Sequence, residues 1–303
     1  MVFVFAILYI LTSFESHKNI LTLISKGIST TIIPYFFLIF FLQFVNWLLE
    51  ALKFYFLLPY SKDLTFIQVL KSVYVGNLTA IITPKRLGNF IGRNWVLKNK
   101  AKQVTISTIT GNFFQLFTTT IMAFFSFLYL YFFKIQFFSE LKDYFLVGLI
   151  LYSIISFFIG YTIFTNNWHP IVNKLKLVKY FNISTVHLNS ITTLRRLRVL
   201  FFAISRYWVF IIQYYILFIG FNIEANFIEL IILVGLLFGS VSFLPSFAPG
   251  NLGTREALSI FFLGGSLLGI KFAMVSFIVW LVNVVFSALI GAGLLFSSKN
   301  IKW

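Results

Sequence analysis

The sequence predicts an all-α polytopic membrane protein with about six full transmembrane helices and two broken, re-entrant helical hairpins in an inverted two-fold repeat. Of its 303 residues, 59% are hydrophobic and 11% are charged, and the mean hydropathy is +0.94. Soluble domains contain only about 45–50% apolar residues. Apolar segments of spanning length recur along the chain, and a motif of proline and glycine occurs twice. We therefore expect residues 1–303 to form a single integral membrane domain.

Five apolar segments are long enough to cross a bilayer, which takes about 20 helical residues for roughly 30 Å of hydrocarbon. Met1–Leu11 is apolar but short, and we expect the end of a retained span there rather than a signal peptide, because no basic residue precedes it. Ser16–Thr31 has the mixed pattern of an amphipathic helix at the membrane surface. The five expected spans are Ile32–Leu58, Val104–Phe133, Tyr144–Phe164, Val199–Phe221 and Phe272–Phe296.

The segment Phe66–Lys98 is expected to enter the membrane and return on the same side. Its apolar first part carries polar residues and is interrupted by Pro84. Thr83 is a suitable helix N-cap and Pro84 a suitable first helical residue, which predicts a second half-helix ending near Leu97. Irregular backbone at membrane depth is tolerated only inside protein or along a water-filled cavity. This hairpin should therefore lie within the protein.

The predicted half-helix has two distinct faces. Arg86, Asn89 and Arg93 follow the i, i+3, i+7 spacing that places them on one side of a helix. Gly88 and Gly92 lie on an adjoining face, where the absence of side chains lets another helix approach closely. The pattern predicts a polar face toward a site and a small-residue face toward a packed neighbour.

The same motif recurs in Phe227–Gly265, which we expect to form the second broken hairpin. Pro249 corresponds to Pro84 and Gly253 to Gly88, and the members of each pair lie 165 positions apart. The spans that precede the two hairpins begin 167 positions apart, at Ile32 and at Val199. Segments and motifs thus repeat with nearly the same offset.

The chain accordingly divides into a first repeat, residues 1–135, and a second, residues 140–303. Lys85–Lys102 and Asn166–Arg198 each contain six Lys or Arg residues and no acid, whereas the connections around Glu140 and Asp143 and around Glu224 and Glu229 are neutral or acidic. Basic loops remain in the cytoplasm. Because each repeat is expected to cross the membrane three times, the second repeat begins on the opposite side. It is therefore inverted relative to the first, as in many transporters. We expect an inner-membrane protein with both termini in the cytoplasm.

Arginines within the membrane are the candidate binding residues. An arginine at the bilayer centre costs about 2.5–3.5 kcal/mol, so Arg86, Arg93 and Arg255 should face a cavity or a partner. We expect two half-helices, starting near the two prolines, to direct their positive N-terminal ends at a phosphate group between them. Asn89 shares this face, and Glu256 could hold Arg255 or Arg93 without ligand, or carry a proton. The alternative is that Arg86 and Arg93 are interfacial residues that extend to the headgroups.

One acidic residue in a span has candidate partners. Glu50 and Lys53 are three positions apart and could pair on one helix face. Arg206 is expected at a similar depth in its own span and could pair with Glu50. We interpret that pair as structural.

Several functional classes are excluded by composition. The net charge of +16 is typical of a membrane protein with basic cytoplasmic loops, and we expect no nucleic-acid partner. The chain has no cysteine, and its three histidines are far apart in sequence, so no metal site and no cofactor are predicted. No nucleophile or paired acid and base is recognisable, so we do not expect an enzyme.

At Thr83–Phe90 and Pro249–Ala257 the sequence resembles a flippase-like membrane family related to the transmembrane region of lysylphosphatidylglycerol synthase. The resemblance extends over nearly the whole chain, since Glu50–Lys53 also falls in the family's order and spacing. It implies a lipid flippase or transporter that moves a phosphate-bearing lipid, a phospholipid or a polyprenyl phosphate, across the inner membrane. The alternatives are a membrane-embedded lipid-processing enzyme and a non-transporting accessory subunit of envelope assembly.

The sequence departs from the family pattern at Asn89, where an acid is usual, and at Lys85, where a small or polar residue is common. Without that acid, Arg86 and Arg93 are expected to be free for a strongly anionic ligand. The expected partners are therefore membrane lipids with anionic headgroups, and the oligomeric state is left open.

Overall fold

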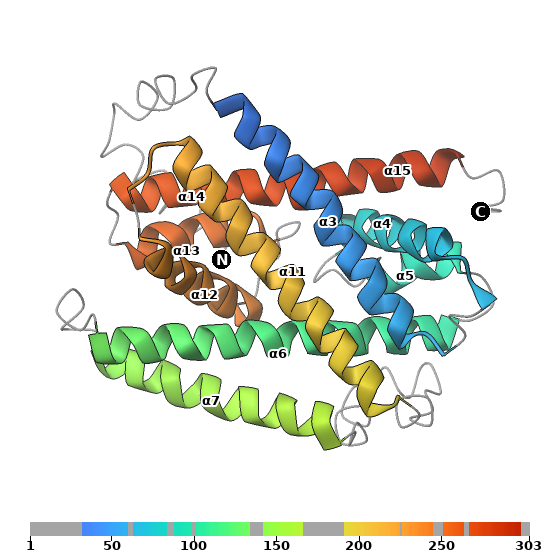
Figure 1. Cartoon of the computed structure of the whole chain (residues 1–303), viewed down its shortest axis with the longest axis horizontal. Helices are drawn as coiled ribbons and strands as arrows, with labels where there is room; N and C mark the ends of the chain where they lie inside the picture. The colour runs from blue at the N-terminus through green and yellow to red at the C-terminus, as the bar shows by residue number, and fades with distance from the viewer. Residues whose placement is uncertain are drawn as a thin grey trace.

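A computed structural model describes residues 32–59, 63–83, 88–97, 101–133, 142–165, 191–224, 226–244, 251–263 and 267–297. Within these ranges the regular secondary structure is helical and contains no strand (Figure 1). The elements are α3 (Ile33–Leu57), α4 (Phe66–Ile82), α5 (Gly88–Val96), α6 (Ala101–Phe133), α7 (Lys142–Thr165), α11 (Thr193–Gly220), α12 (Phe227–Phe243), α13 (Thr254–Phe262), α14 (Leu267–Trp280), the π-helix η6 (Leu281–Phe286) and α15 (Ser287–Ser297).

Five helical stretches in the described part of the chain are long and apolar enough to cross a membrane. They are Ile33–Leu57, Ala101–Phe133, Phe145–Thr165, Thr193–Gly220 and Leu267–Ser297. These stretches confirm the five predicted spans, with small shifts in their ends. The predicted sixth span at Met1–Leu11 and the surface helix at Ser16–Thr31 lie outside the described residues.

Side-chain caps fix where several helices begin. The Thr65 hydroxyl accepts a hydrogen bond from the Gln68 N–H, and the Gln68 side chain accepts one from the Thr65 N–H, so α4 starts with a capping box. The Thr192 side chain accepts a bond from the Arg195 N–H, which starts α11 at Thr193 rather than at the predicted Val199. Capping by a polar residue thus extends this helix beyond its apolar part.

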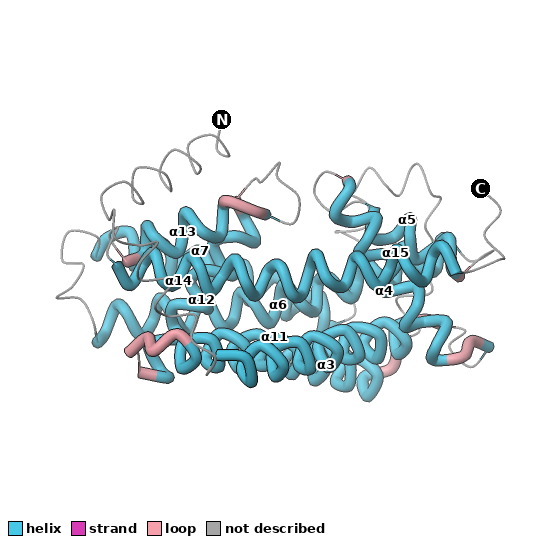
Figure 2. The backbone as a smooth tube through the Cα atoms, turned by 90° about the horizontal axis from the view of Figure 1, so that it is seen from above, coloured by secondary structure: helices cyan, strands magenta, loops and turns pink. Residues whose placement is uncertain are grey.

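The short helices enter the bundle from opposite ends. In Figure 1, α4 runs inward from the right-hand end, where α3 finishes, and α5 returns to that end, where α6 begins. The pair α12 and α13 lies at the left-hand end, and Figure 2 shows the same separation from above. At 17 residues, α4 and α12 are too short to be counted among the spanning helices. Each pair therefore reaches only part of the way through the bundle.

Packing between the two halves of the chain is reciprocal. Helix α4 packs along α15, and α12 packs along α6. The spans that precede the short helices, α3 and α11, pack along each other, and they cross the other long helices obliquely in Figure 1. Each half thus supplies part of a spanning stretch, Ala101–Phe133 or Leu267–Ser297, on which the other half's short helix packs.

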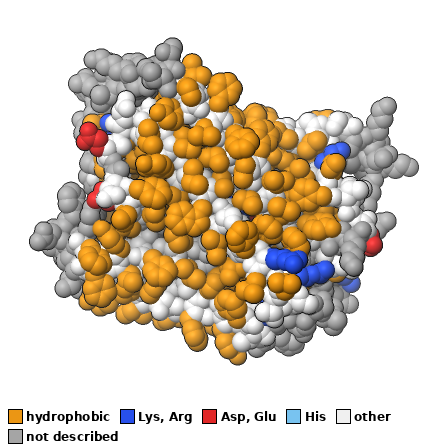
Figure 3. Space-filling model, viewed as in Figure 1, with side chains coloured by type: hydrophobic (Ala, Val, Ile, Leu, Met, Phe, Trp, Pro, Cys, Tyr) orange, Lys and Arg blue, Asp and Glu red, His pale blue; other side chains and the backbone are white. Residues whose placement is uncertain are grey.

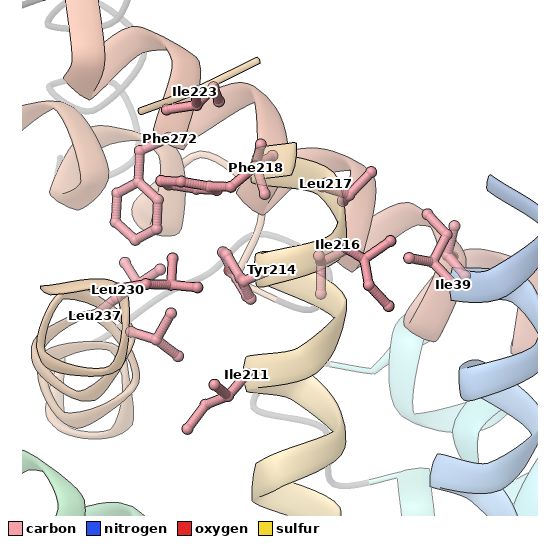
Figure 4. Close-up of a cluster of buried hydrophobic side chains, with 14 of the residues drawn as sticks. Ile39, Ile211, Tyr214, Ile216, Leu217, Phe218, Ile223, Leu230, Leu237 and Phe272 are labelled. Atoms are coloured by element: carbon pink, nitrogen blue, oxygen red, sulfur yellow. The ribbon is translucent and has the colours of Figure 1, made fainter. Parts of the chain in front are cut away.

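The largest buried apolar cluster surrounds α11. In Figure 4, Ile211 and Tyr214 of α11 point toward Leu237 and Leu230 of α12, while Phe218 faces Phe272 of α14. On the opposite side of α11, Ile216 lies toward Ile39 of α3. Helix α11 is therefore the central element against which both halves pack.

The outer faces of the bundle are apolar. Large hydrophobic side chains are exposed along α3 and α7, including Phe37, Phe41 and Phe44 on α3 and Phe157 and Phe158 on α7. Figure 3 shows a face covered almost entirely by hydrophobic side chains, with most of the charged groups near the two ends. A surface of this kind is suited to lipid and not to water. The protein is a multi-pass membrane protein.

Helices α4 and α5 touch through glycine, as the small-residue face predicts. A Cβ atom on Gly88 would meet the Thr79 carbonyl, and one on Gly92 would meet the Thr79 hydroxyl and the Val75 carbonyl oxygen. The Thr79 hydroxyl also donates to the Gly88 carbonyl at 2.6 Å. The two backbones are therefore in direct contact.

Replacing Gly92 with alanine should destabilise the protein, because its Cβ would overlap backbone atoms of α4. We expect a loss of about 1–3 kcal/mol, the usual range for overpacking. Gly293 on α15 is the matched control, since a Cβ there meets nothing within 4 Å. Thermal unfolding of the purified protein in detergent checks this, and equal midpoints for Gly92→Ala and Gly293→Ala would contradict the packing argument.

Candidate functional site

The carboxylate of Glu50 binds three cations from three helices. Lys53 Nζ on the same helix α3 lies 2.6 Å from Glu50 Oε2, and Arg206 Nη1 on α11 lies 2.5 Å from that oxygen. Arg93 Nη2 on α5 lies 2.9 Å from Glu50 Oε1. The predicted pairs of Glu50 with Lys53 and with Arg206 are confirmed, and Arg93 is a third partner. We call these four residues the Glu50 cluster.

Arg93 is held from several directions. Its Nε donates to Asn89 Oδ1 at 3.0 Å, one turn earlier on α5, and its guanidinium lies 4.3 Å from the centre of the Phe54 ring. Gly76 on α4 leaves the necessary space, because a Cβ there would come within 2.8 Å of Arg93 Cγ. Only 2% of Arg93 is exposed. The predicted freedom of Arg93 is therefore wrong, because Glu50 supplies the carboxylate that position 89 lacks.

Arg206 connects the cluster to further polar groups. Its Nε donates to Asn46 Oδ1 at 2.7 Å, and Asn46 Nδ2 donates to Asn283 Oδ1 at 2.8 Å. Asn283 Nδ2 in turn donates to Gln213 Oε1 at 2.9 Å. A chain of hydrogen bonds thus runs from the partly buried Arg206 of the Glu50 cluster across the contact of α3, α11 and η6.

The π-helix η6 provides backbone acceptors for this network. The wider turn displaces carbonyl groups from the regular helical pattern, and such turns frequently occur at functional sites. Trp47 Nε1 donates to the Asn283 carbonyl oxygen at 3.0 Å, and Asn77 Nδ2 donates to that of Val284 at 2.9 Å. Side chains of α3 and α4 therefore satisfy backbone groups that hydrocarbon could not.

The Glu50 cluster contains more positive than negative charge. One carboxylate is shared by Lys53, Arg93 and Arg206, which leaves an excess of two positive charges among these four residues. The side chains of Glu50, Lys53 and Arg93 are at most 6% exposed, and that of Arg206 is 14% exposed. Buried charge is costly unless it is compensated. The arrangement can therefore attract an anion, and Arg206 is the most accessible of its cations.

The second hairpin is organised differently from the prediction. Gly253 has φ of 80°, a left-handed conformation that favours glycine, and the described helix α13 begins after it at Thr254. Glu256 Oε2 accepts a hydrogen bond from the Gly253 N–H at 2.7 Å. The prediction that Glu256 could hold Arg93 is not met, because Glu256 caps its own helix and Arg93 binds Glu50. The region of Pro249, where this helix was expected to start, lies outside the described residues.

Arg255 is linked to the Glu50 cluster through two aromatic rings. Its guanidinium lies 5.7 Å from the centre of Phe238 on α12, and the Phe238 and Phe210 rings are 5.6 Å apart. Arg206 lies 5.9 Å from the centre of the Phe210 ring. The two hairpins thus approach one region from opposite ends, on either side of these rings. A single cavity shared by Arg93, Arg255 and Glu256 stays a prediction.

The start of the predicted half-helix after α4 can be placed only in part. Arg86 and Pro84 lie outside the described residues. Thr83 ends α4, and its hydroxyl donates to the Thr79 carbonyl and accepts from the Gly88 N–H of α5 at 2.6 Å. Thr83 therefore bridges the two helices of the hairpin.

Sequence reasoning missed the amides of this network. Asn46, Gln213 and Asn283 are polar residues inside apolar spans, and each is buried. Asn46 also lies one helical turn before Glu50. That spacing was the available signal for a polar stripe on α3.

Comparison with protein-family models matches residues 1–291 to the lysylphosphatidylglycerol synthase transmembrane region. The chain belongs to this family. Comparisons with curated proteins and with solved structures give no match. The resemblance inferred from the two motifs is confirmed, and membership of the lysylphosphatidylglycerol synthase transmembrane-region family indicates a lipid-related role in the membrane.

Replacing Glu50 with glutamine should strongly destabilise the protein, since three buried cations would lose their carboxylate. Removing one partner of a buried ion pair typically costs about 3–5 kcal/mol. Glu224→Gln is the control, because Glu224 is exposed in the segment that follows α11. Denaturation of the two variants in detergent measures the difference, and a Glu50→Gln variant as stable as the control would show that the cluster does not support the fold.

Proposed function

We propose that this protein is a lipid flippase or transporter that moves a phosphate-bearing lipid, a phospholipid or a polyprenyl phosphate, across the inner membrane. The observation that carries the proposal is the buried excess of positive charge in the Glu50 cluster, located where a half-length hairpin meets two crossing spans. We propose transport without covalent change to the lipid. The partners are membrane lipids with anionic headgroups.

The charge of the cluster suits a phosphate group. A phosphate that crosses the hydrocarbon layer alone loses its hydration, which is costly for any ion. Guanidinium groups offer paired donors to phosphate oxygens, and Arg93 and Arg206 present such groups to one location beside Glu50. The positive charge of the Glu50 cluster would offset the free-energy cost of removing the phosphate from water.

The arrangement of the short helices supports an inverted repeat of residues 1–135 and 140–303. The pairs α4–α5 and α12–α13 enter from opposite ends, and each short apolar helix rests on a long helix of the other half. Transporters with inverted repeats place their substrate site at such an interface and expose it alternately to the two sides. We propose that both termini and the basic start of α11 lie on the cytoplasmic side.

Single cysteines test this topology, and the natural sequence contains none. We expect Pro59→Cys and Lys102→Cys to react with a membrane-impermeant thiol reagent from the cytoplasmic side, because the α4–α5 hairpin returns to the side it left. Asn222→Cys and Leu267→Cys should react from the opposite side. Opposite labelling of positions 59 and 102 would mean that α4 and α5 together cross the membrane, and the inverted repeat would be wrong.

Transport is tested with the protein in proteoliposomes and fluorescent lipids whose leaflet is read by a quencher. We expect Arg206→Gln to slow transfer of a phosphate-bearing lipid about tenfold or more, the effect of losing one charged hydrogen bond. Glu50 keeps Lys53 and Arg93 in this variant, so the fold should persist.

Arg198→Gln is the matched control, since Arg198 is an exposed arginine two turns earlier on α11. Wild-type protein that transfers neither phospholipids nor polyprenyl phosphates faster than empty liposomes would refute transport. Equal slowing by the two arginine variants would refute the role of the Glu50 cluster.

A further inference from the structure

Three buried polar atoms near the second hairpin have no hydrogen-bond partner among the residues that the structure describes. They are Tyr207 Oη on α11, and Arg255 Nε and Glu256 Oε1 on α13. Tyr207 is only 1% exposed and Glu256 is 8% exposed. Buried polar atoms are nearly always paired, so three in one region require an explanation.

The side chains that carry two of these atoms meet at one aromatic ring. The Tyr207 ring contacts Phe238 edge-on, with the centroids 5.9 Å apart, and the Arg255 guanidinium lies 5.7 Å from the centre of the same ring. Tyr214 also contacts the Phe238 ring, with the centroids 5.9 Å apart, and Glu256 directly follows Arg255 on α13. Tyr207 and Arg255 therefore lie against one ring, and Glu256 adjoins Arg255.

The donors and acceptors of this location define a ligand. Tyr207 and Arg255 offer a hydroxyl and a charged N–H, which suit the oxygens of a phosphodiester. Glu256 uses Oε2 to accept from the Gly253 N–H, so Oε1 is available to a hydrogen-bond donor of the ligand. A ligand that satisfies all three groups contains both a phosphate and a donor.

We infer that Tyr207, Arg255 and Glu256 form a headgroup site for a phospholipid that carries an ammonium or hydroxyl donor. Tyr207 and Arg255 bind its phosphate, and Glu256 accepts from its donor. The Phe238 and Phe210 rings connect this site to Arg206 of the Glu50 cluster. The inference deepens the proposed function and rests on it for the lipid nature of the ligand.

Two lipids of equal net charge distinguish the contribution of the donor to binding from that of the phosphate. Phosphatidylethanolamine has N–H donors, whereas phosphatidylcholine has none, and short-chain forms of both can be titrated calorimetrically into the full-length protein in detergent. We expect the wild type to bind phosphatidylethanolamine about tenfold more tightly, the discrimination provided by one hydrogen bond to a charged group. Equal dissociation constants would overturn the inference without any variant.

Glu256→Gln tests the assigned acceptor. The amide oxygen can keep the bond from the Gly253 N–H, and the amide nitrogen then replaces Oε1 with a donor. The preference for phosphatidylethanolamine should fall from about tenfold to about one. An unchanged ratio in the folded variant would overturn the role of Glu256, and if the variant does not fold, the wild-type comparison still decides.

Tyr207→Phe removes one hydroxyl and should weaken both lipids by a similar factor of about five to ten. Tyr215→Phe on the same helix is the matched control, because Tyr215 is 37% exposed. Equal effects of the two tyrosine variants would overturn the assignment of Tyr207. Because binding is measured without transport, a donor preference in a protein that transfers no lipid would uphold this site and refute only the proposed function.

Discussion

The ion pairs of Glu50 determine how the three helices around it are arranged. In a bilayer, lipid tails are as apolar as leucine side chains, so apolar burial alone discriminates poorly between helix positions. The carboxylate of Glu50 contacts Arg93 on α5 and Arg206 on α11, and Lys53 on its own helix. One residue therefore links the first hairpin to both crossing spans, and displacing any of these helices would leave a buried charge without its partner.

Features that depend on local sequence could be predicted. The five spans follow from length and hydropathy, the close contact of α4 with α5 follows from Gly88 and Gly92, and the pairing of Glu50 with Lys53 follows from helical spacing. Even the pair of Glu50 with Arg206 could be predicted, because the depth of a residue in a span can be counted from the span's end. The family resemblance rested on the same local motifs.

The rest could not be predicted because it depends on contacts distant in sequence or on unusual backbone. Arg93 pairs with Glu50 across 43 positions, and only the packed hairpin brings them together. The start of α13 depends on the left-handed conformation of Gly253, and η6 on a wider helical turn whose carbonyls bind Trp47 and Asn77. A glycine permits the left-handed conformation but does not require it, and the wider turn of η6 has no distinct signature in an apolar sequence.

The two hairpins differ in how completely their polar groups are paired. In the first, Arg93 is held by Asn89 and Glu50, and its burial is compensated within the protein. In the second, Glu256 uses one oxygen to cap its helix, and the side chains around Phe238 retain unpaired atoms. A paired group such as Arg93 stabilises one arrangement, whereas unpaired groups gain free energy from a ligand that completes them. Sequence repetition therefore need not imply equal roles, and in the transport that we propose the second hairpin has the stronger chemical reason to bind a lipid headgroup first.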